Sequence, residues 1–301
     1  MRTSAKCAVE RSHKINIRST NMKIINHISE MQQWSETQRL AKKKIAFVPT
    51  MGYLHEGHLS LVHEGKKQGD VVVVSIFVNP MQFNQASDFD KYPRNVEQDQ
   101  RMLEEAGTDV LFYPTAPEIY PEGFQTAVEV SKVSQPLCGA FRPGHFRGVT
   151  TVVAKLFNIV KPHVAVFGQK DFQQCVVIQQ MVKDLNFDLE ILPMPTIREP
   201  DGLAMSSRNA RLSPAEHQTS LCIVRALNQA QEMVTQGERR AEAVLRAVQG
   251  TLAREGGVRL EYVSLCHPET LEEVKQLSGP TLLAIAVWVG EVRLIDNRVL
   301  Q

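Results

Sequence analysis

Short apolar runs alternate with longer stretches of helical spacing over the first two thirds of the chain. Residues 45–48, 70–78 and 110–113 are strand-length runs bounded by polar or turn-forming residues, and residues 95–106 between them have helical spacing. Continuous apolar runs of this kind are typical of strands covered on both faces, as in a parallel sheet. The repeated strand–helix order therefore predicts an α/β fold with a Rossmann-like, doubly wound parallel sheet.

The alternation of strand-like and helix-like stretches continues beyond the middle of the chain. Residues 149–159 have helical spacing, residues 164–167 are another strand-like run, and a helix follows through Gln180. Residues 189–192 are predicted to be the last strand of this domain. Two prolines directly after that run mark the boundary, because proline interrupts both helices and central strands.

The last third of the chain has a different pattern. Residues 198–209 are polar and read as a loop, after which Ser213 precedes proline and Glu216 as in a capped helix start. Two helices follow, with strand-like runs at 260–265, 281–289 and 291–295, the last two forming a hairpin. We expect a Rossmann-like ligand-binding domain over residues 23–195 and a smaller C-terminal α+β lid domain over residues 196–301.

Residues 1–22 form a separate N-terminal extension. The segment is basic and rich in hydroxyl side chains, and Glu10 is its only acid. That composition fits a targeting peptide, but Met22 is also a plausible alternative start. We expect a disordered tail without a role in the activity.

Composition excludes several classes of function. The net charge is +1 and no long basic run occurs, so no nucleic-acid partner is expected. No apolar stretch is long enough to span a bilayer. The five cysteines are far apart and never form a Cys-x-x-Cys pair, which favours reduced thiols over a disulfide or zinc framework. These features predict a soluble, cytoplasmic protein.

The rest of the chain is organised around residues 45–62. A buried strand leads into a turn with Pro49 and Gly52, and a helix follows that carries His55 and His58 near its start. Residues three apart share one face of a helix, and a helix N-terminus offers unpaired N–H groups to a phosphate. The pattern favours a polyphosphate site without a Walker loop. Half of a metal site, or a merely polar helix end, is the alternative.

Three other clusters carry candidate chemistry, each with a plain surface role as its alternative. The loop of Ser206, Ser207 and Arg208 offers two hydroxyls and a permanent cation for a leaving polyphosphate. Lys170 and Asp171 follow a strand and supply a phosphate cation beside a carboxylate suited to ribose hydroxyls. Neutral amides that suit an uncharged, hydroxyl-bearing substrate lie near predicted element ends at Asn79, Gln82 and Gln174.

Two further groups are more ambiguous. Arg142 and His145 lie in a loop stiffened by proline and glycine, where the arginine could bind a carboxylate or a phosphate. A plain surface turn is equally compatible with that sequence. Carboxylates suited to a Mg²⁺ ion that accompanies nucleotide phosphates occur at Asp88, Asp90, Glu97 and Asp99. No nucleophile elbow or Cys–His pair is present in the sequence.

Several motifs together resemble the pantothenate synthetase family. They are Pro-Thr-Met-Gly-Tyr-Leu-His-Glu-Gly-His at 49–58, Ile-Phe-Val-Asn-Pro-Met-Gln-Phe at 76–83, Phe-Arg-Pro-Gly-His-Phe-Arg-Gly at 141–148, Val-Phe-Gly-Gln-Lys-Asp-Phe-Gln-Gln at 166–174 and Leu-Ala-Met-Ser-Ser-Arg-Asn at 203–209. The similarity covers roughly residues 23–297, in the family's order and spacing. It places the chain among the nucleotidyl-transferring Rossmann enzymes with a His-x-Gly-His motif.

The resemblance implies an ATP-dependent ligase that condenses pantoate with β-alanine. Pantothenate, AMP and pyrophosphate are the products, a pantoyl adenylate is the intermediate, Mg²⁺ accompanies ATP, and the protein is a homodimer. Phosphoryl chemistry of this kind needs positioning and charge stabilisation more than an enzyme nucleophile. In the family the second histidine, His58 here, is the proton donor, for which we expect a protonated imidazole.

The resemblance also implies roles for individual residues. The catalytic group comprises His58, His55, Lys170, Ser206, Ser207 and Arg208. The ATP site comprises Pro49, Thr50, Met51, Gly52, Tyr53, Leu54, His55, Glu56, Gly57, His58, Gly168, Gln169, Lys170, Asp171, Ile197, Met205, Ser206, Ser207 and Arg208. Pantoate and β-alanine are expected at Gln82, Gln174, Asn79, Arg142 and His145, and the metal carboxylate maps onto Asp99, whose neighbour is Gln98 where some relatives have a second acid.

Other functions make different predictions. A related adenylyl transferase would use another acid, and a non-catalytic nucleotide sensor would bind ATP without releasing pyrophosphate. A histidine-based metal hydrolase would lose activity with zinc chelators and would not depend on ATP. A tRNA synthetase is disfavoured, because no anticodon-binding module is recognisable after residue 210.

Overall fold

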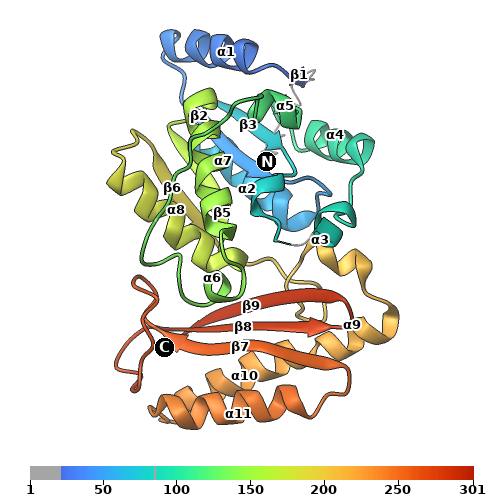
Figure 1. Cartoon of the computed structure of the whole chain (residues 1–301), viewed down its shortest axis with the longest axis vertical. Helices are drawn as coiled ribbons and strands as arrows, with labels where there is room; N and C mark the ends of the chain where they lie inside the picture. The colour runs from blue at the N-terminus through green and yellow to red at the C-terminus, as the bar shows by residue number, and fades with distance from the viewer. Residues whose placement is uncertain (1–21, 85) are drawn as a thin grey trace, which may run out of the picture.

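The computed structural model describes residues 22–84 and 86–301, so the predicted tail lies outside the described residues except for Met22, and so does Cys7. The described chain forms two sheets with helices around them (Figure 1). The larger sheet lies in the upper part of the view, and the smaller one crosses the lower part above α10 and α11. The four cysteines in the described part of the chain, Cys138, Cys175, Cys222 and Cys266, are all free and buried.

The larger sheet has six strands in the order β1-β4-β3-β2-β5-β6, and every neighbouring pair is parallel. This confirms the predicted doubly wound α/β fold. The order reverses between β2 and β5, which creates the crevice at the carboxyl ends of the strands where such folds bind ligands. The strands are β1 (Lys23–Ile25), β2 (Ile45–Thr50), β3 (Val71–Ile76), β4 (Val110–Phe112), β5 (Val164–Gly168) and β6 (Glu190–Met194).

Alternate residues of each central strand enter different hydrophobic clusters. Ile45 and Phe47 of β2 pack on one face of the sheet, whereas Ala46 and Val48 pack on the other. Side chains alternate along a strand, and helices cover both faces, so every position of the strand must be apolar. This explains why the runs are continuously apolar in the sequence.

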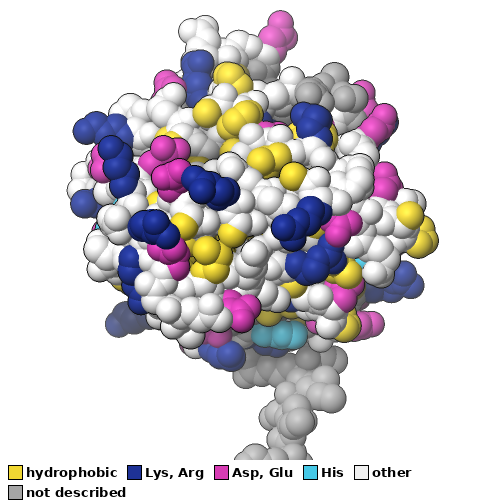
Figure 2. Space-filling view, turned by 90° about the horizontal axis from the view of Figure 1, so that it is seen from below, with side chains coloured by type: hydrophobic (Ala, Val, Ile, Leu, Met, Phe, Trp, Pro, Cys, Tyr) yellow, Lys and Arg dark blue, Asp and Glu magenta, His cyan; other side chains and the backbone are white. Residues whose placement is uncertain are grey.

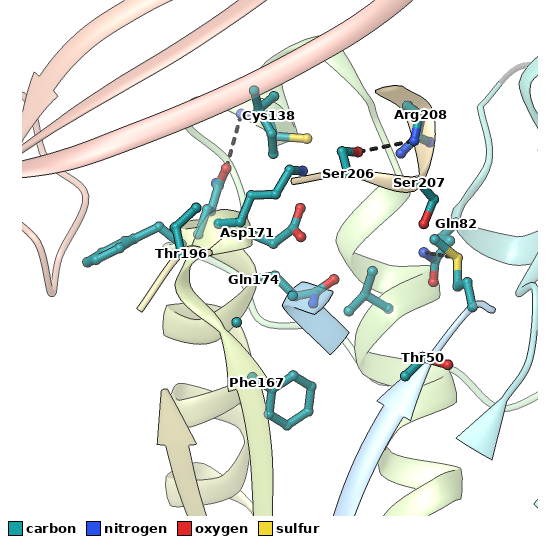
Figure 3. A pocket seen from close by; sticks show the side chains of 18 of the residues that line it. Thr50, Gln82, Cys138, Phe167, Asp171, Gln174, Thr196, Ser206, Ser207 and Arg208 are labelled. Carbon is teal, nitrogen blue, oxygen red and sulfur yellow. Dashed lines mark hydrogen bonds between the residues drawn. The ribbon is translucent and has the colours of Figure 1, made fainter. Parts of the chain in front are cut away.

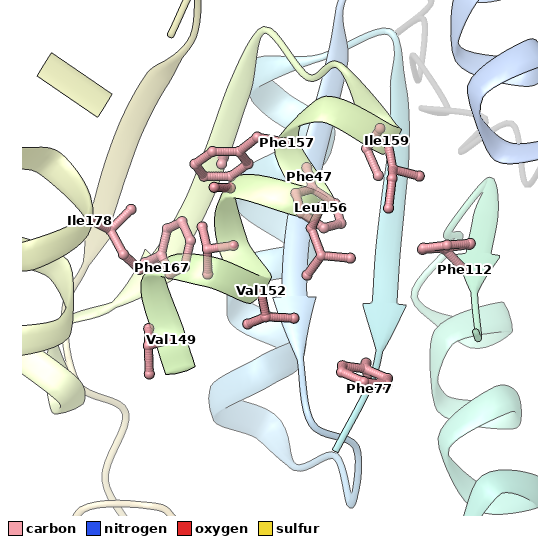
Figure 4. Packing of buried hydrophobic residues seen from close by; sticks show 14 of the residues in the cluster. Phe47, Phe77, Phe112, Val149, Val152, Leu156, Phe157, Ile159, Phe167 and Ile178 are labelled. Atoms are coloured by element: carbon pink, nitrogen blue, oxygen red, sulfur yellow. The ribbon is translucent and has the colours of Figure 1, made fainter. Parts of the chain in front are cut away.

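Helices of the first domain surround this sheet. α7 is buried along almost its whole length and packs against β2, with Phe157 in contact with Phe47 (Figure 4). The helices are α1 (Ile28–Leu40), α2 (Glu56–Gln68), α3 (Ala86–Asp90), α4 (Val96–Glu105), α5 (Ala116–Ile119), α6 (Cys138–Phe141), α7 (His145–Val160) and α8 (Phe172–Asp184), with 3₁₀ turns η1 (Pro80–Gln82) and η2 (Gln169–Asp171).

The predicted helix at 149–159 begins four residues too late. α7 starts at His145, directly after Gly144, which adopts the left-handed conformation with a φ of 80°. Proline and glycine before the helix indicated a loop, but they mark its entry instead. His145 therefore belongs to a rigid helix start.

The last third forms the expected α+β unit around an antiparallel sheet in the order β7-β8-β9. Ser213 and Glu216 form a reciprocal capping box at the start of α9, as predicted. The hairpin around Gly290 is also present, although β7 and β9 are longer than expected. The elements are η3 (Ser207–Arg211), α9 (Pro214–Ser220), α10 (Cys222–Thr235), α11 (Ala241–Ala253), β7 (Val258–Cys266), β8 (Thr281–Val289) and β9 (Val292–Leu300).

The two faces of the central strand β8 pack against different parts of the protein. Leu283, Ile285 and Val287 pack with the apolar faces of α10 and α11. Leu282 and Ala284 point the other way and cluster with residues of the first domain such as Leu137. The second sheet therefore lies between its own helices and the Rossmann-like unit. The boundary predicted at residues 195/196 falls just after the end of β6 and stays a prediction.

The surface carries no strong charge asymmetry on the face shown in Figure 2, where Lys and Arg side chains alternate with Asp and Glu. Such a mixed surface differs from the basic stripe typical of nucleic-acid binding. None of the helices in the described part of the chain has both the length and the apolar character that a membrane span requires.

Candidate active site

A cavity of about 260 Å³ lies beyond the carboxyl ends of β2 and β5, at the reversal point of the larger sheet. Loops that follow β2, β3, β5 and β6 line it on one side, and strands of the second sheet line it on the other. The volume is close to the lower end of the range for small-molecule sites. Figure 3 shows Gln82, Gln174 and Asp171 around this space, with the loop of Ser206, Ser207 and Arg208 beside it.

The turn between β2 and α2 is held in an uncommon conformation. Gly52 and Tyr53 have φ values of 81° and 51°, and a Cβ on Gly52 would lie 2.9 Å from Ile76 Cγ2. Asp99 of α4 fixes this turn, because its two carboxylate oxygens accept the N–H groups of Tyr53 and Leu54 at 2.8 and 2.7 Å. The turn is thereby set before any ligand arrives.

The two histidines of the motif bind the backbone through the same ring atom. His55 caps α2 and its Nδ1 accepts the N–H of Gly57 at 3.1 Å, while His58 Nδ1 accepts the N–H of His55 at 3.3 Å. A backbone N–H can only donate, so each neutral ring carries its proton on Nε2. Gly57 leaves room for the His55 ring in this position, since a Cβ there would lie 2.8 Å from the ring.

Both imidazoles are neutral in the free protein. Burial, aided by the Lys170 cation, lowers the pKa of His55 to about 4. Burial, then the neighbouring His55 and Lys170, lowers the pKa of His58 to about 3. The expected protonated His58 is therefore not present before a ligand binds. His58 offers an Nε2–H hydrogen bond instead of a full positive charge.

The turn after β3 carries two buried amides. Asn79 caps η1, and its Nδ2 donates to Gln82 Oε1 at 3.0 Å and to the Gly148 carbonyl at 3.1 Å. Gln82 Nε2 donates to Met51 Sδ at 3.2 Å. Both amides line the cavity, as the sequence predicted.

Arg142 and His145 converge on the backbone of the same turn. Arg142 Nη2 and His145 Nδ1 both donate to the Gln82 carbonyl, at 3.1 and 2.8 Å. Because a carbonyl only accepts, His145 carries its proton on Nδ1. Burial, then the Arg142 cation, lowers the pKa of His145 to about 3, so its ring is neutral. Both side chains line the cavity and also support Gln82.

The turn after β5 presents Lys170, Asp171 and Gln174 to the cavity. A residue of the second sheet holds this turn in place, since Asn297 Nδ2 donates to the carbonyls of Gln169 and Lys170, both at 2.9 Å. Within the described part of the chain, no atom beyond the two neighbouring residues lies within 4 Å of a potential Cβ on Gly168, so open space remains beside it.

The loop after β6 folds back over the site. Ser206 caps η3 by accepting the N–H of Arg208 at 3.2 Å, and Ser207 Oγ donates to the Tyr53 carbonyl at 3.0 Å. Arg208 pairs with Asp88 at 2.9 Å. Ile197 and Met205 meet in the same loop through a 3.0 Å backbone hydrogen bond. The loop is thus docked on the β2–α2 turn.

The second sheet contributes residues that the sequence analysis missed. Arg293, Ile295 and Asn297 alternate along β9 and line the cavity, together with Tyr262 of β7. Arg293 is held by Glu261 at 2.6 Å. No polar–apolar alternation in the sequence marked this face, because Leu294 and Ile295 are both apolar and residues 296–298 are all polar.

The predicted site residues largely come together. Those that line the cavity are Pro49, Thr50, Met51, His55, Gly57, His58, Asn79, Gln82, Arg142, His145, Gly168, Lys170, Asp171, Gln174, Ile197, Met205, Ser206, Ser207 and Arg208. Six described residues of the predicted set do not line it, namely Gly52, Tyr53, Leu54, Glu56, Gln169 and Asp99.

The geometry does not fit Asp99 as a direct magnesium ligand. It lies outside the cavity lining, and each oxygen already accepts a backbone N–H. Within the described ranges, the group of carboxylates and histidine close enough to share an ion is Glu199, Asp201 and His217, which does not line the cavity either. His55 and His58 are not members of that group, which argues against the alternative that these two histidines form half of a metal site.

Comparisons with known proteins identify relatives along nearly the whole chain. The family model described as pantoate-beta-alanine ligase matches residues 23–299. Pantothenate synthetase from Syntrophus aciditrophicus is 54% identical over 278 residues, covering 92% of this chain and 97% of the relative. The one from Geobacter sulfurreducens is 56% identical over 279 residues, with 93% and 99% covered.

Solved structures agree with the sequence comparison. The crystal structure of pantothenate synthetase from Thermus thermophilus superposes with a TM-score of 0.88 at 43% identity, covering 92% of this chain and 99% of that one. A pantoate-beta-alanine ligase from Francisella tularensis, complexed with beta-gamma ATP and beta-alanine, gives a TM-score of 0.74 at 36% identity, covering 92% and 97%.

Proposed function

The chain belongs to the pantoate-beta-alanine ligase family, and from this premise we propose how its residues divide the work of the reaction. The enzyme is a ligase that forms pantothenate from pantoate and β-alanine with ATP. The proposal is that the reaction passes through a pantoyl adenylate in the cavity between the two sheets. The observation that carries it is the convergence of His55, His58, Lys170 and the Ser206–Arg208 loop on one space.

In the first step a pantoate carboxylate oxygen attacks the α-phosphorus of ATP. The new P–O bond forms as the bond to the bridging oxygen breaks, and that electron pair leaves with pyrophosphate. Lys170 and Arg208 supply positive charge, and the Nε2–H groups of His55 and His58 donate to phosphate oxygens. Fixed donors and cations of this kind stabilise developing negative charge without reorganisation.

Pantoate binding is assigned to Gln82 and Gln174. Their neutral amides suit a substrate with hydroxyl groups, and both line the cavity, with Gln174 above Phe167 and Gln82 above Thr50 in the view of Figure 3. Asp171 is assigned to the ribose of ATP, with backbone around Ile197 near the adenine. These assignments rest on position in the cavity and on the family resemblance.

In the second step the β-alanine amine attacks the carbonyl carbon of the acyl adenylate. The C–O bond to phosphate breaks, AMP leaves, and the amine loses a proton as the amide forms. A mixed anhydride is activated enough to need no enzyme nucleophile. The F. tularensis relative holds beta-alanine. Arg142 is the proposed partner of the β-alanine carboxylate. It lines the cavity, and among the described residues it donates to the Gln82 carbonyl and forms no ion pair with a carboxylate.

Magnesium is proposed to arrive with ATP as part of the substrate. A Mg²⁺ ion bound to nucleotide phosphates keeps several waters and needs few protein ligands. This removes the need for Asp99 as a ligand. The cytoplasm as location and a homodimer as assembly, both usual for the family, are proposed as well, and sedimentation of the purified protein tests the dimer.

Single-turnover pyrophosphate release tests the two-step order. Enzyme in excess over MgATP is mixed with pantoate alone, and β-alanine is added afterwards. We expect one equivalent of pyrophosphate before the amine is added, and AMP with pantothenate only after it. Pyrophosphate that appears only when β-alanine is present would contradict the adenylate intermediate.

A further inference from the structure

The side chain of Tyr120 contacts the turn after β3, which carries Asn79 and Gln82, from outside the cavity lining. Tyr120 follows α5 and does not itself line the cavity among the described residues. Its hydroxyl donates to Asn79 Oδ1 at 2.8 Å, and its ring packs against Phe77 and Phe124. Burial raises the pKa of the Tyr120 hydroxyl, so it remains a donor at physiological pH.

The backbone fixes which way round the Asn79 amide lies. Asn79 Oδ1 accepts the Met81 N–H at 3.3 Å, and Nδ2 donates to the Gly148 carbonyl at 3.1 Å. A backbone N–H can only donate and a carbonyl can only accept, so oxygen and nitrogen cannot be exchanged. With Tyr120 and Gln82 as the remaining partners, every donor and acceptor of this amide is used.

The orientation of Gln82 follows from that of Asn79. Because Asn79 Nδ2 donates to Gln82 Oε1, the Gln82 amide must turn its Nε2 the other way. There its hydrogen-bond partner among the described residues is Met51 Sδ, at 3.2 Å, and a thioether is a weak acceptor. Gln82 therefore presents N–H donors to the cavity, and an oxygen of the substrate is a better acceptor than the sulfur.

We infer that Tyr120 is a positioning residue for the acid substrate, acting through Asn79 to hold Gln82 as a hydrogen-bond donor. The chain of hydrogen bonds runs from Tyr120 through Asn79 to Gln82, and its last N–H groups face a carboxylate or hydroxyl oxygen of pantoate. This inference rests on the proposed function, which assigns pantoate to Gln82. The N–H groups of Gln82 favour an oxygen acceptor of the substrate at that point and disfavour a donor such as an ammonium group.

The two sides of the cavity have separate supports. Tyr120 is connected to the pantoate side, whereas Lys170, His58 and Arg208 on the phosphate side are held by other hydrogen bonds. Loss of the Tyr120 hydroxyl should therefore affect pantoate and leave MgATP unchanged. A purely structural role would affect both substrates together.

The central variant is Tyr120→Phe, which removes the donor and keeps the ring between Phe77 and Phe124. We expect the KM for pantoate to rise about five- to tenfold, the usual consequence of losing one buried hydrogen bond. The KM for MgATP and kcat should stay within about twofold. Tyr113→Phe, which removes a hydroxyl on the other face of the sheet, is the matched control and should change neither KM.

Gln82→Ala separates the inference from the proposed function. If it raises the pantoate KM but Tyr120→Phe leaves that KM unchanged, the positioning role is wrong and the substrate assignment stands. If Gln82→Ala leaves the pantoate KM unchanged, the substrate assignment itself fails. A parallel rise of both KM values with a lower Tm in Tyr120→Phe would assign a structural role only, and would overturn the inference.

A spectroscopic readout follows the amide directly. In protein labelled with ¹⁵N-glutamine, the side-chain NH₂ resonances of Gln82 are identified by their loss in Gln82→Ala. We expect them to shift or broaden in Tyr120→Phe and to be unchanged in Tyr113→Phe. Identical Gln82 resonances in Tyr120→Phe and the natural protein would contradict the hydrogen-bond chain.

Discussion

At the scale of single residues, hydrogen-bond direction determines what each side chain of the site can offer. His55 and His58 use Nδ1 to accept backbone N–H groups, so Nε2–H remains for a phosphate. Asp99 uses both oxygens on the backbone of the turn before them. The turn, its carboxylate and its two imidazoles thus form one prearranged set of donors.

Asp99→Asn tests whether Asp99 holds the turn or binds magnesium. The amide has one acceptor oxygen, so one N–H of the turn would face an NH₂ group, at a cost of about 1–3 kcal/mol in unfolding free energy. We expect a lower Tm and a higher KM for MgATP. The magnesium concentration for half-maximal rate at fixed saturating ATP should stay the same. A large increase in that concentration, with an unchanged Tm, would restore Asp99 as a metal ligand.

His58→Ala tests the donor role of the neutral imidazole. Removing one donor to a developing oxyanion costs about 10²- to 10³-fold in rate. We expect a loss of this size in adenylate formation with pantoate affinity nearly intact, measured by single-turnover pyrophosphate release and by equilibrium binding of pantoate. His63→Ala is the control, since His63 is exposed on the same helix. An equal loss of pantoate affinity in His58→Ala would show that the assigned role is wrong.

At the scale of elements, the position of η1 against α7 determines where Gln82 lies. Gly148 of α7 allows this approach, because a Cβ there would lie 2.4 Å from the Met81 carbonyl oxygen and 2.7 Å from the Gln82 N atom. The same helix supplies the Gly148 carbonyl to Asn79 and the His145 ring to Gln82. The pantoate side of the site is therefore built by close contact between one helix and one turn.

Gly148→Ala should separate this turn from the helix. The new methyl group meets backbone atoms, which cannot move aside as a flexible side chain can, so we expect a lower Tm and a pantoate KM raised at least about tenfold. Gly250→Ala in α11 is the control, since among the described residues nothing outside its own helical turn lies within 4 Å of its potential Cβ. That change should stabilise the protein by about 0.5–1 kcal/mol. Unchanged pantoate kinetics in Gly148→Ala would contradict the account.

The sequence predicted the elements of the first domain well, since both faces of its strands are covered and their apolar runs are continuous. It predicted most cavity residues from the β2–α2, β3, β5–α8 and Ser206–Arg208 segments. It missed Arg293 and Asn297, because strand alternation tells which residues share a face but not which surface that face meets. It also assigned Asp99 by resemblance, while its hydrogen bonds to Tyr53 and Leu54 depend on long-range packing.

At the scale of the whole molecule, the second sheet completes the site. Asn297 of β9 donates to two carbonyls of η2, next to Lys170. Leu282 and Ala284 of β8 pack on the first domain. The phosphate side of the cavity therefore depends on how the second sheet packs against the Rossmann-like unit.

Asn297→Ala tests this dependence. Loss of the two hydrogen bonds should loosen the turn that carries Lys170, so we expect the KM for MgATP to rise about tenfold with pantoate KM nearly unchanged. Asn228→Ala on α10 is a control, because Asn228 bonds the partly exposed Arg298 at 3.0 Å and does not line the cavity. A rise in the pantoate KM alone would contradict the proposed division of the cavity.

The lowered pKa values of three site histidines predict how the unfolding free energy depends on pH. The pKa values of His55, His58 and His145 are lowered to about 4, 3 and 3, below the ordinary value near 6.5. Below pH 6.5 the unfolded chain therefore binds more protons than the folded protein. The contribution of these histidines to the unfolding free energy is fully present above that pH and is lost as the pH decreases. Each histidine contributes at most about 1.4 kcal/mol per pH unit.

Urea unfolding between pH 5 and 8 measures this dependence. We expect little change from pH 7 to 8 and a clear decrease from pH 6.5 to 5, with proton uptake on unfolding. A stability that is constant down to pH 5 would contradict neutral imidazoles at the three positions.

The transfer of a labelled oxygen from pantoate to AMP tests whether the reaction passes through a pantoyl adenylate. Pantoate carrying ¹⁸O in its carboxylate is converted with MgATP and β-alanine, and the products are analysed by mass spectrometry. Attack of the carboxylate on the α-phosphorus predicts one ¹⁸O atom in each AMP, one retained in pantothenate, and none in pyrophosphate. AMP without ¹⁸O, or label in pyrophosphate, would contradict a pantoyl adenylate formed in this cavity.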